Sequence, residues 1–284
     1  MEEEVKSHYI AYFDILGYSA LIHENKDNVQ DILFKYLHLV QDVIRKTKNT
    51  YPAYEKITLK MFSDNFLIIY GDDNRWSNDD YQSVKALSYL LALIQLHCLE
   101  KYHILIRGCI TKGEIYYNKD VIFGDGLIRA VELEKRAIYP RIILDKERLE
   151  DEACGELCEK CIRFDTDEEY YVDFFDIIGW GIYNDDEFAD EEKHQPYIRD
   201  AVYDLVLANG TYSEKEKTVN DIELQEKIIA KYTWLLSKYN EYCYFYADDM
   251  MLPFELKLNH KYMKYEININ PELGDTYSPV YWQQ

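Results

Sequence analysis

Two short apolar runs, each carrying one aspartate, constrain this chain more than any other feature. The first is Tyr12–Tyr18, read YFDILGY, and the second is Lys60–Phe66, read KMFSDNF. Runs of this length are typical of buried strands, so Asp14 and Asp64 are expected at strand ends. Two carboxylates brought together can hold divalent cations against a triphosphate, because each cation bridges carboxylate and phosphate oxygens.

Composition restricts the function classes that remain. The chain has 284 residues, of which 48% are hydrophobic and 30% charged, which is enough for a sizeable core and a catalytic domain with an appendage. The net charge of −21 repels the phosphate backbone and anionic lipid, so we expect no nucleic-acid and no membrane partner. No apolar run reaches transmembrane length and no secretory leader is evident, which favours a cytoplasmic protein.

The first two thirds of the sequence predict an α+β fold. The expected order is strand, helix, hairpin, helix, hairpin, helix, strand and strand, giving a mainly antiparallel sheet with helices on one face, a ferredoxin-like plan. One hairpin is expected to have Phe62–Asn65 at its tip, and another to turn at Thr111–Gly113. The remaining expected elements are strands at 8–14, 141–144 and 170–178 and helices at 29–44, 79–102 and 124–136.

The composition shifts after Trp180. An acidic loop at 184–192 precedes two helical patterns, at 197–207 and from 213 to about 242, and the tail from 248 shows no clear period. We therefore divide the chain into a domain over 1–182 and a second region over 183–284, composed of the acidic loop, a helical hairpin and a tail.

Three cysteines, at positions 154, 158 and 161, have the spacing C-x3-C-x2-C. This spacing also occurs in iron–sulfur enzymes, but a fourth ligand is missing and no βα repeat follows. Because positions i, i+4 and i+7 share one face of a helix, packing of small apolar side chains is the favoured interpretation.

The motifs resemble those of class III nucleotidyl cyclases. The run Phe13–Tyr18 resembles the family's F-x-D-I-x-G-[FY] signature at the end of the first strand, and Lys60 precedes Asp64 by four residues, as a lysine precedes the second metal aspartate there. Ile106–Glu114 is similar to the L-R-x-G-x-x-x-G-E strand, and Phe123–Glu134 to the start of the helix that follows. The likeness covers about residues 6 to 180 and implies a nucleotidyl cyclase fold.

Within that family, the sequence more closely resembles the pyrimidine cyclases of bacterial Pycsar antiphage systems. The segments that carry this resemblance are Gly124–Glu134, Tyr139–Ile142 and Lys231–Leu235. The resemblance implies a lyase that converts UTP or CTP to cUMP or cCMP plus pyrophosphate for antiviral defence. It also implies a homodimer with shared active sites and a downstream effector reached through the cyclic nucleotide.

The resemblance also implies a set of site residues. Asp14, Asp64 and the backbone carbonyl of Ile15 would hold two Mn²⁺ or Mg²⁺ ions. Lys60 would read the base, Phe13 would pack beside the nucleotide, and Gly17 would contact it. From the residues alone, each aspartate could instead be a helix N-cap or turn residue, and Lys60 a solvated strand residue. Arg107 is expected to be structural, buried against a carboxylate.

Two positions depart from the family pattern. The ribose-orienting asparagine falls at Ile128 and the transition-state arginine at Glu132. Arg129 or Arg136, on the same helix face as Glu132, could supply the missing charge, and Arg129 is our candidate; the alternative is a surface ion-pair ladder. Two further functions therefore stay open, an adenylate or guanylate cyclase and a catalytically silent, cyclase-like module for nucleotide sensing or dimerisation.

Overall fold

The computed structural model describes residues 5–19, 29–51, 54–71, 80–149, 161–176, 191–209, 219–246, 254–259 and 264–269. The chain divides into two compact units. One consists of residues 1–98 and 104–177, and the other of residues 99–103 and 178–284. The first unit contains both aspartates of the sequence motifs. The predicted boundary near residue 182 remains a prediction.

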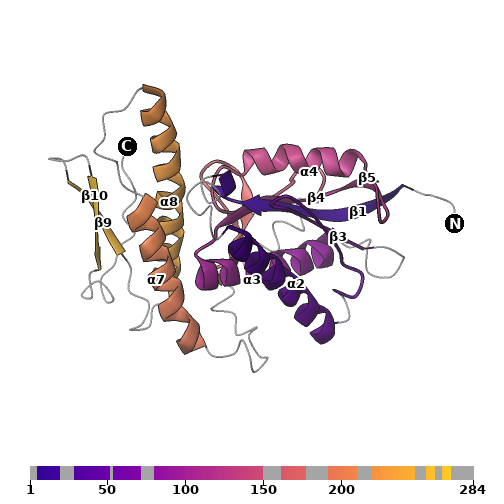
Figure 1. Cartoon of the computed structure of the whole chain (residues 1–284), viewed down its shortest axis with the longest axis horizontal. Helices are drawn as coiled ribbons and strands as arrows, with labels where there is room; N and C mark the ends of the chain where they lie inside the picture. Colours follow the sequence, from indigo (N-terminus) through magenta and orange to yellow (C-terminus); the bar gives the residue numbers. More distant parts are fainter. Residues whose placement is uncertain are drawn as a thin grey trace. The chain divides into compact units, whose positions relative to one another are not determined.

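The first unit is an α+β structure, as expected (Figure 1). Its elements are β1 (Lys6–Ile15), α2 (Val29–Thr50), β2 (Thr58–Phe62), β3 (Asn65–Tyr70), α3 (Asp80–Tyr102), β4 (Ile106–Tyr117), β5 (Ile122–Phe123), α4 (Asp125–Arg136), β6 (Ile142–Leu144), β7 (Ile162–Phe164) and β8 (Tyr170–Val172).

The sheet is mainly antiparallel, with the strand order β2-β3-β1-β4-β6-β8-β7. Its first four strands, with α2 and α3 between them, form the β-α-β-β-α-β unit of a ferredoxin-like fold. Only the β4–β6 pair of this sheet is parallel in the described chain. The central position of β1 explains its sequence, because a strand with neighbours on both sides and helices over both faces has to be apolar along its length.

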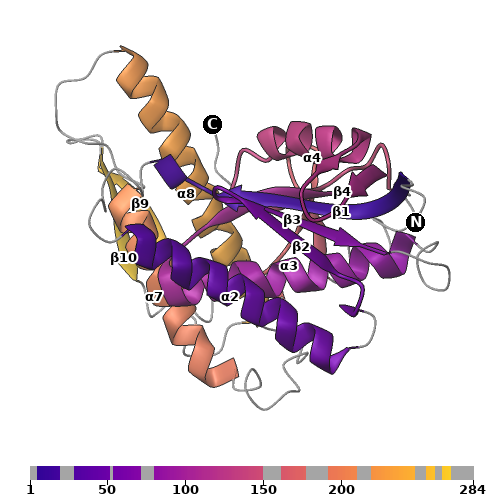
Figure 2. The same cartoon turned by 45° about the vertical axis from the view of Figure 1, so that its right-hand side comes forward.

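The expectation that all helices lie on one face was wrong. Figures 1 and 2 show α2 and α3 on one face of the sheet and α4 on the other. Side-chain contacts agree: Tyr36 of α2 packs edge-on against Phe66 of β3 at 5.1 Å between ring centroids, whereas the thiol of Cys109 on β4 donates to the carbonyl of Ala130 in α4. The two faces therefore have different coverings, and the α4 face carries Asp14.

The hairpin predicted at Thr111–Gly113 was also wrong. Strand β4 runs unbroken for 12 residues, and its pairing with β1 continues through Tyr9 opposite Lys112 and His8 opposite Gly113. Gly113 allows β4 to pack closely against α4 and does not form a turn, because a Cβ at this position would lie 2.6 Å from the Cα of Gly126. The two glycines let the first turn of α4 lie directly on β4.

The remaining predicted elements are present with small changes of boundary. Ser63 and Asp64 form the two-residue turn between β2 and β3, with Ser63 at φ 57°. The last predicted strand is shorter, at Tyr170–Val172, and pairs with the unpredicted strand β7. Cys161 is a buried turn residue just before β7, whereas the other two cysteines of the predicted helix face lie outside the described residues.

The second unit contains the predicted pair of helices, α7 (Glu191–Asn209) and α8 (Val219–Tyr246), which pack on each other. The tail forms a two-stranded antiparallel sheet of β9 (Phe254–Asn259) and β10 (Lys264–Ile269). Most of the expected acidic loop lies outside the described residues. Among the helices in the described part of the chain, none is both long and apolar enough to cross a membrane.

Candidate active site

Asp14 and Asp64 lie at one end of the central strands. In the β1–β3 register Phe13 is opposite Phe66, so the next position of β1, Asp14, meets the start of β3 at Asn65, directly after Asp64. The side chains of Asp14 and Tyr12 share the α4 face, since alternate residues of a strand point the same way. The negative charge of Asp64 contributes to raising the pKa of Asp14, after burial, which is the larger cause. The strand register therefore places the two acids at the same end of β1 and β3.

A chain of hydrogen bonds orients Asp64. The hydroxyl of Tyr12 donates to Oδ1 of Asn65 at 2.6 Å, and Nδ2 of Asn65 donates to Oδ1 of Asp64 at 3.3 Å. Ser63 adds a second donor to the same oxygen at 3.0 Å. Burial, followed by the charges of Glu134, Asp14 and Asp64, raises the pKa of Tyr12 to about 12, so its hydroxyl remains a donor at neutral pH. Both of the hydrogen bonds to Asp64 are accepted by Oδ1, and neither involves Oδ2.

Asp14 is held by an arginine. Nε of Arg107 donates to Oδ1 of Asp14 at 3.1 Å, and Nη2 donates to Oδ2 at 3.2 Å. Arg107 comes from β4, where it lies opposite Asp14 in the register, and Nη2 also lies 2.7 Å from Oε1 of Glu134 in α4. The ion pair expected for Arg107 is thus present, with a second carboxylate added.

The donors at this site suit a hard divalent cation. Carboxylate and backbone oxygens are the ligands that Mg²⁺ and Mn²⁺ prefer. One of these carboxylates, Asp14, already has a positively charged partner in Arg107. In the described ranges, no group of three or more His, Cys, Asp or Glu side chains is arranged to hold a metal ion. Asp14 and Asp64 offer carboxylate oxygens and Ile15, whose side chain is buried, offers only its carbonyl, so these three remain the predicted ligands.

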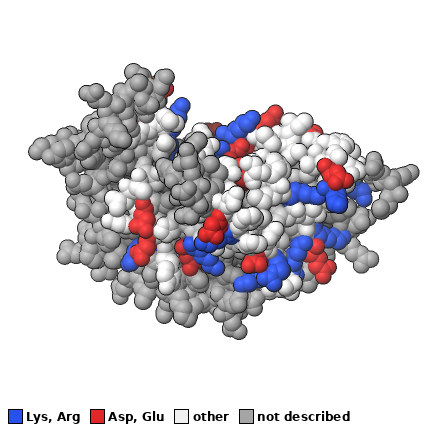
Figure 3. Space-filling model, viewed as in Figure 1, with Lys and Arg blue, Asp and Glu red and all other residues white. Residues whose placement is uncertain are grey.

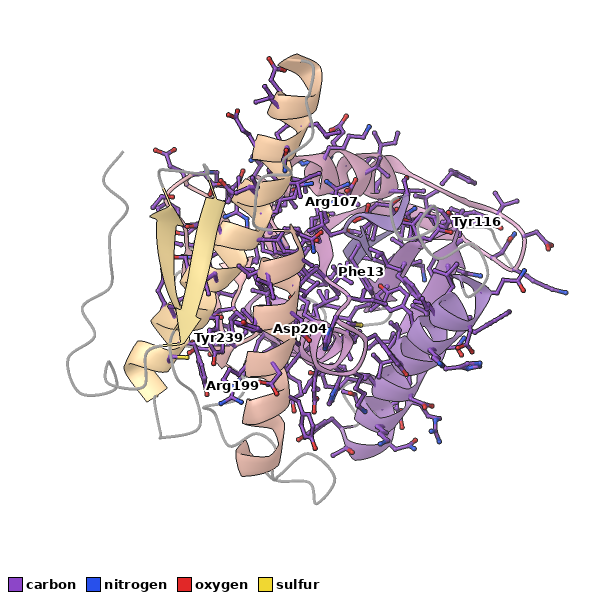
Figure 4. The ribbon with its side chains drawn as sticks, turned by 60° about the vertical axis from the view of Figure 1, so that its left-hand side comes forward. Phe13, Arg107, Tyr116, Arg199, Asp204 and Tyr239 are labelled. Atoms are coloured by element: carbon purple, nitrogen blue, oxygen red, sulfur yellow. The ribbon has the colours of Figure 1, made fainter. Side chains whose placement is uncertain are left out.

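Phe13 does not take the place predicted for it. Its ring has no exposed surface and stacks on Phe66 at 5.4 Å between centroids, on the side of the sheet that packs against α2. In Figure 4 it lies among packed side chains, whereas Arg107 contacts Glu134 of α4. A ring without exposed surface offers no face to a nucleotide, so Phe13 is a core residue.

Arg129 is likewise committed elsewhere. Its Nε and Nη2 donate to the two oxygens of Asp145 at 2.8 and 2.6 Å, and Nη2 also contacts Glu147 at 2.9 Å. The structure does not bring Arg129 to Asp14, and a role at the phosphates would require breaking this bidentate pair. The neighbouring Arg136 pairs with Glu169 at 2.6 Å. The ion-pair alternative for these two arginines therefore describes the structure better, although their partners are not on α4.

The predicted roles of Lys60 and Gly17 in nucleotide binding remain predictions. Lys60 of β2 is opposite Leu67 of β3, which in turn is opposite Tyr12 of β1, so Lys60 lies on the α4 face of the sheet. Its Nζ donates to the carbonyl of Asn118 at 2.7 Å. Gly17 lies in the exposed turn after β1 with φ 80°, a conformation that glycine adopts without strain.

Three residues that position the acids were not identified as such from the sequence. Tyr12 and Asn65 adjoin the motif aspartates, so the alternation of β1 and the short β2–β3 turn could have indicated them. Glu134 lies 120 residues from Asp14 and reaches it only through the packing of α4 on the sheet, so only the general likeness of this helix to the family pointed at it.

The surface charge is mixed over the part of the molecule that Figure 3 displays. Acidic and basic side chains of the described residues are interspersed there. Although the net charge is −21, the described residues on this face carry both signs of charge. An anionic ligand would still need a local positive charge, and Arg107 is the nearest cation to Asp14 that the ion pairs show.

Neither a family model nor a curated protein matches the chain. Parts of it are similar to solved cyclase structures. The guanylyl cyclase Cya2 is 15% identical over 52% of this chain and 78% of its own, with a TM-score of 0.40. The guanylyl cyclase domain of the RhoGC fusion protein from the aquatic fungus Blastocladiella emersonii is 13% identical over 60% and 97%, with a TM-score of 0.41. Adenylate cyclases from Trypanosoma brucei are 14% identical over 59% and 90%, with a TM-score of 0.40. Likeness at this level does not bear on activity or substrate, which have to be argued from the residues.

Proposed function

We propose that this chain is a nucleotidyl cyclase that converts a pyrimidine nucleoside triphosphate, UTP or CTP, to its 3′,5′-cyclic monophosphate and pyrophosphate. The observation that carries the proposal is that Asp14, from the end of β1, and Asp64, from the β2–β3 turn, lie at the same end of two paired strands. The motif resemblance to class III cyclases supports the same reaction, and the resemblance of 124–134 and 139–142 favours the pyrimidine branch.

The reaction makes one bond and breaks another at the α-phosphorus. The ribose 3′-oxygen attacks, loses its proton, and pyrophosphate leaves with the electron pair of the broken bond. Two Mn²⁺ or Mg²⁺ ions held at the site would lower the pKa of the 3′-hydroxyl and neutralise charge on the triphosphate.

The chain's own contribution is binding and orientation. Asp14, at the end of β1, and Asp64, in the β2–β3 turn, would supply oxygen ligands, and the hydrogen bonds through Asn65 fix the direction of Asp64. Arg107 balances the charge of Asp14. Lys60, on the same face, is the proposed base-reading donor, and Gly17 the proposed close approach of backbone to the nucleotide. The paired sites of a homodimer, the effector and the role in antiviral defence belong to the same proposal.

A second function, a silent cyclase-like module, has one observation in its favour. Both oxygens of Asp14 are engaged by Arg107, and the position of the family's ribose-orienting asparagine holds Ile128, whose side chain is exposed on α4. An exposed isoleucine donates no hydrogen bond to a sugar. Such a module would bind a nucleotide or a second copy without turning it over.

One experiment separates these functions. The full chain is incubated with each of ATP, GTP, UTP and CTP in the presence of Mn²⁺, and the products are separated by chromatography and identified by mass. We expect cUMP or cCMP, with pyrophosphate in equal amount. Asp64→Ala should abolish the product while leaving the melting temperature unchanged, because the side chain lies in a solvent-accessible turn. A purine product would replace the pyrimidine assignment, and no product together with measurable nucleotide binding would establish the silent module.

A further inference from the structure

Arg107 is shared between two carboxylates from different elements. It binds both oxygens of Asp14 on β1, and its Nη2 lies 2.7 Å from Oε1 of Glu134 on α4. All three side chains are largely shielded from solvent, with exposed fractions of 26% for Arg107, 13% for Asp14 and 8% for Glu134. At such burial a guanidinium has to keep an acidic partner, because an unpaired buried charge is costly.

The site holds more negative than positive charge. Asp14 and Glu134 contact Arg107, and the charge of Asp64 acts on the same arginine. Burial, together with mutual repulsion between Asp14 and Glu134, raises the pKa of Glu134. Because three acids act on one arginine, the binding of a further cation near them is electrostatically favourable.

A divalent cation at Asp14 would share the carboxylate with Arg107 and would repel the guanidinium, because both carry positive charge. Glu134 already contacts the same guanidinium nitrogen, so Arg107 can keep an acidic partner with a side-chain adjustment and without moving β4 or α4. We infer that Glu134 is a positioning residue that retains Arg107 when a divalent cation binds Asp14. This inference rests on the proposed function, in which Asp14 and Asp64 hold the cations.

Two simpler roles for Glu134 predict different behaviour. A purely structural counter-ion would change the stability of the protein and leave its affinity for the cation unchanged. A carboxylate acting directly on the cation would change that affinity whether or not Arg107 is present. A residue that acts by retaining Arg107 changes the affinity only when Arg107 is there, which a double-mutant cycle detects.

The test measures Mn²⁺ binding to the full chain without nucleotide, by the loss of the electron paramagnetic resonance signal of free Mn²⁺. Glu134→Gln is compared with Glu132→Gln, which removes the same charge from an exposed position of the same helix. We expect Glu134→Gln to weaken Mn²⁺ binding about tenfold, the size associated with loss of a charge-assisted contact, and Glu132→Gln to change it less than about twofold.

The same pair of variants is then made in an Arg107→Gln background, where we expect Glu134→Gln to change Mn²⁺ affinity less than about twofold. If Arg107→Gln does not melt cooperatively, Arg107→Lys replaces it, because a lysine lacks the planar fork with which Arg107 binds the two oxygens of Asp14. The effect of Glu134→Gln should then fall below about threefold.

The outcomes separate the inference from the proposed function. Mn²⁺ binding by the wild-type chain with an unchanged affinity in Glu134→Gln overturns the positioning role and leaves the cyclase proposal standing. An equal loss in both backgrounds overturns it as well, in favour of a direct action on the cation. Absence of Mn²⁺ binding in the wild-type chain overturns the positioning role, whereas the cyclase proposal is decided separately by the product assay.

Discussion

Two arginine clusters lie along α4, and they differ in how well their charges are balanced. In the first cluster Arg107 lies between Asp14 and Glu134, and in the second Arg129 lies between Asp145 and Glu147. Burial raises the pKa of Asp14 in spite of its hydrogen bonds from Arg107. Burial would also raise the pKa of Asp145, yet hydrogen bonds from Arg129 and Thr111 hold it below the usual value.

The difference is informative because Asp145 is the more deeply buried of the two acids, with 1% of its side chain exposed against 13% for Asp14. Asp145 has three strong donors, at 2.6 to 2.8 Å, whereas the contacts of Asp14 with Arg107 are longer and two other acids lie nearby. The Asp145 cluster is a completed structural network. The Asp14 cluster has unmet charge, as expected of a site that receives a cationic ligand.

Asp14→Asn should have the largest effect on activity. It removes a proposed cation ligand while keeping the shape of the side chain, so cyclic nucleotide formation should fall about a thousandfold. The free energy of unfolding should change by less than about 1 kcal/mol, because Arg107 keeps Glu134 as a partner. Turnover and urea unfolding are measured on the same preparation. If Asp14→Asn turned over as fast as the wild-type chain, the Asp14 cluster would not differ in function from the Asp145 cluster.

Arg129→Gln should have the opposite profile. It leaves Asp145 buried with only Thr111 and backbone donors, so the protein should lose about 2 kcal/mol of stability in urea unfolding. Turnover per folded molecule should stay within about threefold of wild type, because Arg129 does not reach Asp14.

The matched control for Arg129→Gln is Arg45→Gln, whose pair with Asp42 on α2 is exposed and should be worth less than about 0.5 kcal/mol. A large loss of turnover in Arg129→Gln at unchanged stability would restore the catalytic role predicted from the sequence.

The smallest expected effect is on the pH dependence of stability. The contributions of Asp145 and Asp14 to the free energy of unfolding should change with pH in opposite directions. The lowered pKa of Asp145 means that its contribution to stability is present above about pH 4 and is lost as the pH falls through its folded value. The raised pKa of Asp14 means that its contribution declines as the pH rises above about 4 toward its folded value.

Urea unfolding between about pH 3 and pH 7, with a chelator present, measures both contributions. Relative to wild type, Asp145→Asn should flatten the acid limb, and Asp14→Asn should remove a decline toward neutral pH. The same sign for both variants would contradict the distinction between the clusters.

The sequence predicted those elements whose signal is local. The apolar run of β1 ending at Asp14, the tight turn at Ser63–Asp64 and the helix beginning near Gly124 each follow from a few adjacent residues. The convergence of the two acids was also predictable, because adjacent antiparallel strands bring the end of one to the start of the next. The role of Phe13 was not, since the resemblance fixes its position in the chain and not the face on which its ring lies.

What the sequence by itself determined is the α+β class, the mainly antiparallel sheet and the place of the two acids at its strand ends. Only the tertiary structure decided that β4 continues through Gly113, that α4 covers the opposite face from α2 and α3, and that Glu134 shares Arg107 with Asp14. The physical reason is range: propensity and periodicity act over a few residues, whereas a glycine contact between strand and helix, or an ion pair across 120 positions, exists only once the chain has packed.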